Sequence, residues 1–107
     1  MPLPPELSPH ARRAALDKAA AARRQRAELK EKLKMGSVDL DELLAAAERD
    51  EVVAKMKVVA VLESLPGVGK VRARRLMEAL EISDSRRVRG LGAKQREALR
   101  KQFPSSR

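Results

Sequence analysis

The stretch LPGVGKVRA at residues 65–73 decides how this chain folds, because it reads as a tight glycine turn between two short helices. Pro66 is expected to end the first helix, and the two glycines permit backbone angles that a side chain would forbid. Val68 would point inward and hold the turn to the core, while Ala73 would let the two helices cross closely. The amide groups that begin the second helix would then face outward, where the helix dipole favours an anion.

The run from Leu65 to Ala73 resembles, without a gap, the helix–hairpin–helix family, whose pattern centres on Gly-apolar-Gly-x-x-x-Ala. The resemblance implies that the hairpin amides hold DNA or RNA phosphates without reading the base sequence. A turn that merely reverses the chain is the structural alternative. The residues assigned to phosphate binding at this turn are Pro66, Gly67, Val68, Gly69, Lys70, Arg72 and Arg74.

A second turn, RRVRGLGAK at residues 86–94, again has glycines on both sides of an apolar residue, with a lysine close behind. We interpret it as a second phosphate-contacting turn, whose arginines contact the DNA backbone or the minor groove. The alternative is a capped loop in which Leu91 fills the core and the arginines are solvated. The residues assigned to DNA binding here are Arg86, Arg87, Arg89, Gly90, Gly92 and Lys94.

Composition narrows the function classes. The chain has 107 residues, 24 Lys and Arg against 15 Asp and Glu, no Cys, one His and one aromatic residue. A chain of this length has room for one small domain. Thiol chemistry, a cysteine-held metal or iron–sulfur cluster and a histidine-based metal site or triad are excluded. Without Trp or Tyr the chain also lacks the stacking platform typical of single-strand readers.

The positive charge is concentrated in the second half. Residues 1–50 hold 10 basic and 9 acidic side chains, whereas residues 51–107 hold 14 and 6. The acidic segment 39–51 reads as a solvated face, but residues 70–101 carry 11 basic side chains against 4 acidic ones. A polyanion is therefore the expected partner of the second half.

Capping signals divide most of the chain into helices. A helix capped by Ser8 and ended by Gly36 is expected first, followed by one capped by Ser37 or Asp39. We expect an all-α fold of about five helices and no sheet, because the one valine-rich run has no second strand to pair with. The expected helices span residues 9–35, 40–49, 57–64, 69–81 and 93–102, with a helical or turning connector at 51–56.

The expected organisation is a flexible lead-in at 1–8, a long basic helix at 9–36, a helix–two-turns–helix domain at 37–103 and a flexible tail at 104–107. The long helix has few large apolar residues, so its first turns are expected to project from the body. The residues of the helix at 69–81 expected to face the core are Val71, Ala73, Leu76, Met77 and Leu80. The arginines assigned to a second DNA surface on the long helix are Arg12, Arg13, Arg23, Arg24 and Arg26.

The chain as a whole is similar to actinobacterial integration host factor, a likeness that covers nearly all of residues 8–103. It rests on the runs at 15–24, 27–30, 55–58, 62–73 and 86–92. The resemblance implies a monomeric, nucleoid-associated protein that binds duplex DNA with little sequence preference, bends or compacts it and affects topology and site-specific recombination. A cytoplasmic location is expected because the sequence has no run of about 18 apolar residues and its N-terminal stretch does not read as a transit peptide. The arginines of the long helix predict bridging of two duplexes or recombinase complexes. No cofactor, metal, membrane or small-molecule substrate is expected.

Three other functions stay open. A ribosomal-type protein that binds rRNA would share the helix–two-turns–helix likeness. A DNA glycosylase would share the hairpin, but glycosylases of the endonuclease III type place a nucleophilic lysine two residues after the second glycine. In this chain that position is Val71, and Lys70 lies one residue early. We therefore expect no enzyme. A protein-docking hairpin would use the acidic segment 39–51 as its contact face.

Overall fold

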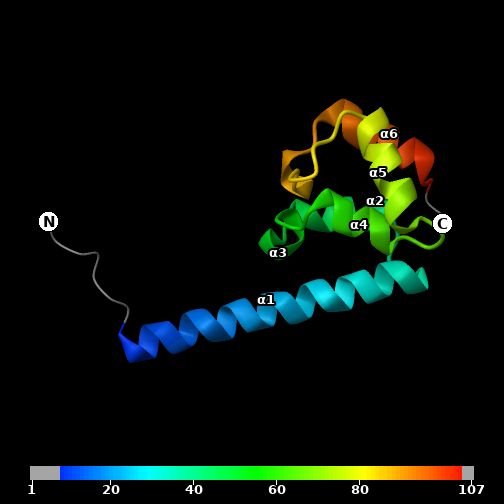
Figure 1. Cartoon of the computed structure of the whole chain (residues 1–107). Coiled ribbons are helices and arrows are strands. Elements are labelled where there is room, and N and C mark those ends of the chain that lie inside the picture. The colour runs from blue at the N-terminus through cyan, green and yellow to red at the C-terminus, as the bar shows by residue number, and fades with distance from the viewer. Residues whose placement is uncertain (1–7, 105–107) are drawn as a thin grey trace, which may run out of the picture.

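The computed structural model of this chain describes residues 8–104. Those residues form six α-helices, one short 3₁₀ helix and no strand, which confirms the all-α prediction (Figure 1). The number of helices exceeds the expected five because the first part of the expected connector is itself helical. The predictions for residues 1–7 and 105–107 lie outside the described residues. The elements are α1 (Pro9–Met35), α2 (Leu40–Ala47), α3 (Glu51–Ala54), α4 (Val58–Ser64), α5 (Gly69–Ala79), η1 (Val88–Gly90) and α6 (Ala93–Gln102).

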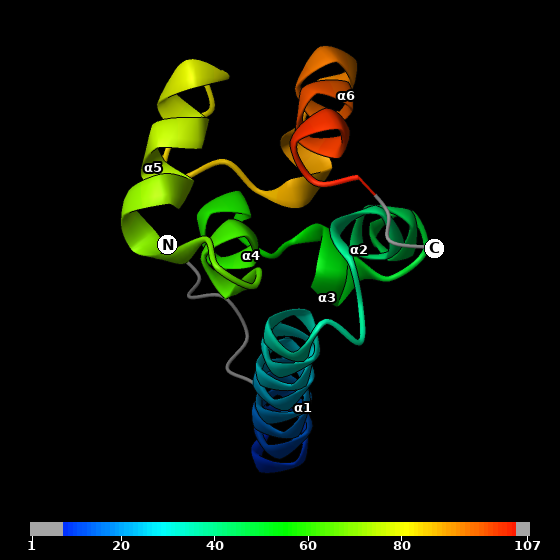
Figure 2. The same cartoon turned by 90° about the vertical axis from the view of Figure 1, so that its right-hand side faces the viewer.

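The helices lie in three tiers (Figures 1 and 2). α1 lies along one side, α2 to α4 form the middle, and α5 and α6 lie on the other side. α4 contacts both α1 and α5, so it connects the tiers. The N-terminal half of α1 extends beyond the other helices as a rod (Figure 1), as its shortage of large apolar residues predicts.

Both ends of α1 are formed as the sequence predicts. The hydroxyl of Ser8 accepts a hydrogen bond from the amide of Ala11 at 3.0 Å and so caps the first turn. Gly36 ends the helix with a φ of 79°, and its amide donates to the carbonyl of Leu33 at 3.1 Å. Leu33 itself is fully buried. The C-terminal end of α1 is therefore part of the core, whereas its N-terminal end is not.

The starts of α2 and α3 are capped by acidic side chains. Asp39 accepts a hydrogen bond from the amide of Glu42 at 2.8 Å, and the Glu42 carboxylate accepts one from the amide of Asp39 at 3.2 Å. Asp50 accepts hydrogen bonds from the amide of Val52 at 2.9 Å and from the side-chain amide of Gln25 at 2.6 Å. The Gln25 contact ties α1 to the start of α3. Of the two candidate caps for α2, the aspartate is the one that is used.

The rest of the acidic segment 39–51 also faces cations of the same chain. Asp41 lies 2.8 Å from Arg100, and Glu48 lies 3.9 Å from Arg96, both on α6. Such exposed ion pairs contribute only about 0–1 kcal/mol each. Their position nevertheless shows that the acidic segment acts as the electrostatic partner of the basic second half.

The core is apolar, and no polar or charged side chain is buried among residues 8–104. Ala73 on α5 is fully buried and Met77 is 1% exposed, so α5 packs closely on α4 as predicted. The prediction that Val71 faces the core is wrong, because its side chain is 66% exposed. Val71 precedes Ala73 by two residues, which places it about 200° away around a helix of 3.6 residues per turn.

An isolated antiparallel β-bridge joins Lys57 to Arg87. The amide that follows Lys57 donates to the carbonyl that precedes Arg87, and the amide that follows Arg87 donates to the carbonyl that precedes Lys57, both at 2.9 Å. These two bonds fix the loop before η1 to the start of α4. The bridge therefore sets the position of the arginine-rich turn.

Candidate nucleic-acid interface

The hairpin turn between α4 and α5 presents bare backbone. Gly67 and Gly69 have φ values of 74° and 67°, a region that side chains disfavour. Leu65 and Val68 are each 7% exposed, so two apolar anchors hold the turn to the core. A Cβ atom added at either glycine would meet nothing within 4 Å. The glycines are thus required by conformation, and their outer face is open.

α5 begins at this turn without a side-chain cap. The amides of its first turn have no partner within the helix, and the helix dipole adds positive potential there. Lys70 and Arg74 are exposed on α5. The guanidinium of Arg72 lies 5.8 Å from the ring centroid of Phe103, a cation–π contact that holds it beside the end of α6. Open amides next to exposed cations suit a phosphate group.

The second glycine turn is built differently from the first. Neither Gly90 nor Gly92 has a positive φ among the described residues, and residues 88–90 form the 3₁₀ helix η1. The guanidinium of Arg86 donates to the carbonyl of Gly90 at 2.7 Å. A Cβ atom at Gly90 would lie 3.0 Å from the Cδ atom of Arg86, so a larger residue here would have to displace the arginine side chain slightly. The two turns share a sequence pattern but not a conformation.

The three arginines of the second turn have different surroundings. Arg86 is occupied by its bond within the turn. The guanidinium of Arg87 donates to the carbonyl of Lys55 and so ties the loop to the end of α3. Arg89 is exposed and donates no hydrogen bond within the described residues. Of these three arginines, only Arg89 therefore has an exposed side chain whose guanidinium N–H groups make no hydrogen bond within the described residues.

The start of α6 is fastened to the end of α5. The side-chain oxygen of Gln95 accepts a hydrogen bond from the amide of Gly92 at 3.0 Å. Its side-chain nitrogen donates to the carbonyls of Leu80 at 3.3 Å and Glu81 at 3.2 Å. No side chain caps the first turn of α6, and Lys94 in that turn is exposed. The start of α6, like that of α5, thus has no N-cap side-chain bond and carries an exposed cation.

α1 faces the rest of the protein across a groove. Arg26, Lys30 and Arg87 line one hollow of the groove, with a volume of about 350 Å³. Lys30, Glu31 and Lys34 line another, of about 580 Å³, whose opposite wall is Glu63 and the hairpin turn at 64–69. Lys30 therefore lies between the two glycine turns and connects their surroundings into one basic strip.

The sequence interpretation missed the lysines of this strip, which are Lys30, Lys34, Lys55 and Lys57. Helical spacing was a usable signal for the first two, since they follow Arg26 by one and two helical turns and so share its side of α1. Lys55 and Lys57 reach the strip because the chain around them pairs with the Arg87 loop. Arg87 and Lys55 are 32 residues apart, and no local pattern predicts such a contact.

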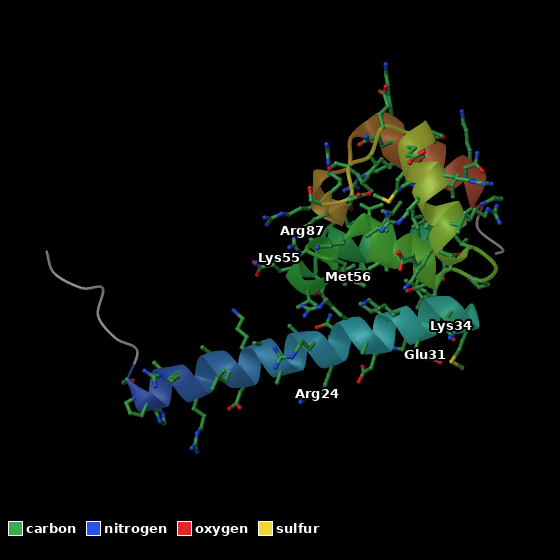
Figure 3. The ribbon with its side chains drawn as sticks, viewed as in Figure 1. Arg24, Glu31, Lys34, Lys55, Met56 and Arg87 are labelled. Carbon is green, nitrogen blue, oxygen red and sulfur yellow. The ribbon has the colours of Figure 1, made fainter. Side chains whose placement is uncertain are left out.

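The arginines assigned to a second surface on α1 do not share one face. Arg26 is partly buried and lines the groove. Arg24 points away from the body of the protein (Figure 3). Arg12 and Arg13 lie on the projecting part of α1, together with an exposed Leu16. The structure thus divides these arginines between the groove, the far side and the free end of the helix.

The carboxylates of Glu31 and Glu63 line the same hollow as Lys30 and Lys34. A third, that of Glu51, lies 2.7 Å from the ammonium of Lys55. Its hydrogen bond with Lys55, and more weakly the charges of Lys18 and Arg89, lower the pKa of Glu51. Glu51 thus stays ionised to a lower pH than an isolated glutamate. It is an exposed group, so this pair contributes little to stability.

Among residues 8–104 no helix has the length and hydropathy needed to span a membrane. Residues 33–103 match the family model described as an S13-like H2TH domain. The matched region begins at Leu33, where α1 enters the core, and ends at Phe103, beside Arg72. The helix order and the two turns place the chain among the small helix–two-turns–helix proteins.

The relatives are more specific. The integration host factor of Streptomyces coelicolor is 57% identical over 106 residues, which cover 99% of this chain and 98% of the relative. Those of Mycolicibacterium smegmatis and Mycobacterium tuberculosis are each 57% identical over 102 residues, which cover 95% of this chain and 97% of the relative. The chain belongs to the actinobacterial integration host factor family, so the resemblance stated from the sequence is confirmed.

A solved structure described as "Structure of sIHF bound to an 8bp palindromic DNA" has a similar fold. Its TM-score is 0.79 and its sequence is 56% identical. The match covers 81% of this chain and 98% of that chain. The helical arrangement is therefore shared by a protein that was observed on duplex DNA.

Proposed function

We propose that the protein is a nucleoid-associated protein that binds duplex DNA through phosphates and the minor groove with little sequence preference. The observation that carries this proposal is the hairpin turn, where Gly67 and Gly69 leave bare backbone beside the uncapped start of α5. The integration host factor relatives and the similar structure with DNA support it. Phosphates are the same in every base sequence, so amide contacts to them favour binding without sequence readout. A duplex-DNA partner places the protein on the nucleoid, in the cytoplasm.

Shaping of the DNA is assigned to the second turn. Arg86 and Arg87 stiffen this loop by donating hydrogen bonds to backbone carbonyls, so Arg89 is carried on a rigid loop. An arginine on a rigid loop keeps its position when it enters a DNA groove, so the DNA must bend or the groove must widen around it. We infer that the protein bends or compacts DNA and acts on topology and site-specific recombination by this route.

The far side of α1 offers a second contact. Arg24 points away from the body (Figure 3), and Arg13 lies about three helical turns earlier on the same side. A monomer with cations on opposite sides can hold two duplexes, or one duplex and a recombinase complex. Bridging by a single copy would require this far side.

A binding role without catalysis fits the hairpin residues. Val71 stands where a glycosylase of this type would carry its lysine nucleophile, and Lys70 lies in the first turn of α5 instead. The relatives are named integration host factor, a name that states no catalytic activity. Base release or strand cleavage that persists in repurified Lys70→Ala protein would contradict this assignment.

An rRNA-binding role is the second candidate, favoured by the S13-like description of the matched domain. Equal masses of structured RNA and unlabelled duplex should be compared as competitors of labelled duplex DNA at one salt concentration. We expect the duplex to compete better. Displacement by RNA at least as strong as displacement by duplex would favour the ribosomal-type role.

The central test is a binding and circularisation assay across a salt series on duplexes of several lengths. About five neutralised phosphates would give a slope of log K against log salt near −4.5. A slope shallower than about −2 would show that the basic face is not a DNA footprint. Binding that is indifferent to salt would instead favour a protein-docking role.

The assignment of DNA shaping is tested most cleanly with Arg89→Ala, because this side chain makes no hydrogen bond within the described residues. We expect circularisation of short duplexes to fall more than affinity does. Arg86→Ala with Arg87→Ala should show the same pattern, but it also loosens the loop. Arg49→Ala, which removes an exposed cation beside the acidic segment, is the matched control. Equal losses of bending and affinity would contradict a separate shaping role.

A further inference from the structure

The hollow between α1 and the Arg87 loop has an unusual lining. Its volume is about 350 Å³, and its walls come from α1, the end of α3, the start of α4 and the loop before η1. No acidic side chain and no aromatic ring line it. Its five cationic residues are Arg26, Lys30, Lys55, Lys57 and Arg87. We call this hollow the five-cation cleft.

The walls of the five-cation cleft are fixed in place. The antiparallel bridge between Lys57 and Arg87 holds two of the cations on paired backbone. The guanidinium of Arg87 is tied to the carbonyl of Lys55, and both lie at the edge of the body that overlooks α1 (Figure 3). On the other wall, Gln25 binds Asp50 at 2.6 Å and so fastens the middle of α1 beside the cleft. The cations are therefore held together by backbone and not merely by flexible side chains.

The charge of the cleft is poorly balanced by the protein itself. Lys55 has a carboxylate partner in Glu51, at 2.7 Å. Arg26, Lys30 and Lys57 make no ion pair within residues 8–104. Like charges gathered in a partly enclosed hollow repel one another and raise the local positive potential. A bound anion would remove this repulsion.

The chemistry of the lining selects phosphate among anions. The guanidinium of Arg26 offers a planar fork that matches phosphate oxygens. The N–H groups of Arg87 that are not bonded to the carbonyl of Lys55 add further donors, and three ammonium groups add point charges. Phosphate offers more acceptor oxygens than a carboxylate, and a free phosphate compound also carries more charge, so phosphate suits a site with five cations. With no aromatic ring in the lining, the cleft has nothing on which to stack a base. The ligand is thus recognised by phosphate alone.

We propose that the five-cation cleft is a phosphate-binding site, and that a bound phosphate clamps α1 onto the body of the protein. Arg26 and Lys30 come from α1, whereas Lys55, Lys57 and Arg87 come from the body, so one phosphate attracts cations on both sides of the junction. The phosphate comes from the backbone of bound duplex or from a free phosphate compound. The first source extends the DNA footprint and rests on the proposed function. The second source does not depend on it.

The first experiment measures the melting temperature of the full chain with inorganic pyrophosphate and with sodium chloride of equal ionic strength. Binding at ten times Kd is expected to raise Tm by about 5 °C. The test variant, Arg26→Gln with Lys30→Gln, should lose at least half of this rise. The control, Lys18→Gln with Lys32→Gln, removes two charges from α1 outside the cleft and should keep it. Equal rises in both variants, or no rise in the wild type, would overturn the proposal.

The second experiment separates the two sources. If backbone phosphate enters the cleft, pyrophosphate should compete with duplex DNA in the wild type more than in the test variant. The variant should also lower the steepness of the salt dependence by about 1.8 for two lost contacts. A pyrophosphate-induced rise in Tm without competition assigns the site to free phosphate. Failure of the wild type to bind DNA would refute the proposed function, while the Tm experiment would still decide on the cleft.

Discussion

The helices of the first half of the chain begin differently from those of the second half. Ser8, Asp39 and Asp50 each cap a helix by accepting a hydrogen bond from a backbone amide. α5 begins at Gly69, and α6 begins after Gly92, both without a side-chain cap. The first half thus satisfies its helix starts with side chains of the N-cap residues. In the second half Gln95 bonds the amide of Gly92, but no N-cap side chain bonds the first-turn amides of α5 or α6.

Charge follows the same division. Residues 1–50 are nearly neutral, with 10 basic and 9 acidic side chains, and residues 51–107 carry 14 and 6. A capping carboxylate would repel a phosphate at the same amides, so capping and phosphate binding are alternative uses of a helix start. The difference teaches that the second half forgoes a common source of stability at the helix starts that we propose bind phosphate.

The largest expected effect on stability comes from adding side chains at the two glycines of the hairpin turn. Gly67→Ala with Gly69→Ala forces two side chains into the left-handed region, at about 1–2 kcal/mol each. The free energy of unfolding, measured by urea denaturation, should fall by about 2–4 kcal/mol. Gly92→Ala is the control, because its φ of −74° suits any residue and its Cβ atom would lie 3.6 Å from the nearest atom. Equal losses in the two proteins would contradict the difference between the turns.

Removal of a cap in the first half should affect stability alone. Asp39→Ala breaks the capping box of α2 and should lower the free energy of unfolding by about 1 kcal/mol. DNA affinity, measured by fluorescence anisotropy with labelled duplex at a temperature where both proteins are folded, should not change. Asp39→Asn, which keeps a capping oxygen, should recover most of the stability. A weaker DNA affinity in folded Asp39→Ala protein would contradict the claim that caps in the first half affect stability alone.

The end of α5 can be stabilised by a glycine in the left-handed region, as Gly36 ends α1. Glu81 has a φ of 56°, and the amide of Ile82 after it donates to the carbonyl of Met77 at 2.8 Å. Glu81→Gly removes the strain of a side chain in the left-handed region and should raise the free energy of unfolding by about 0.5–1 kcal/mol. Gly36→Ala is the reciprocal change and should lower it by a similar amount. A loss of stability in Glu81→Gly would show that this carboxylate has another role.

The smallest effect should come from giving α6 an N-cap side chain of the kind that caps α1, α2 and α3. Gly92→Ser supplies a hydroxyl at the start of α6 and should gain a few tenths of a kcal/mol. Gly92→Asp should gain a similar amount while weakening DNA binding, since its charge lies at the amides assigned to phosphate. Thermal unfolding and anisotropy on the same samples compare the two properties. Tighter DNA binding by Gly92→Asp would remove α6 from the proposed interface.

Local rules were sufficient wherever a residue acts on its own neighbours. The cap at Ser8, the end at Gly36 and the hairpin glycines all follow from single-residue preferences, and the structure agrees with them. Local rules failed at Gly90, where the sequence pattern suggested a second hairpin glycine but φ is not positive and the aliphatic part of Arg86 packs against the residue. They failed again at Lys57, which joins the candidate interface through a bridge to Arg87. Such contacts depend on how distant segments meet, and a lone sequence pattern does not contain that information.

The long rod of α1 has a consequence for how the molecule moves through solvent. The radius of gyration is 16.4 Å and the principal extents are 50 × 32 × 25 Å, whereas a compact domain of this length has a radius near 13 Å. An elongated particle experiences more friction than a sphere of equal mass, so a single copy should elute early from a gel-filtration column. An apparent size near that of a dimer is therefore what one extended copy would give, and light scattering is the measurement that counts subunits correctly.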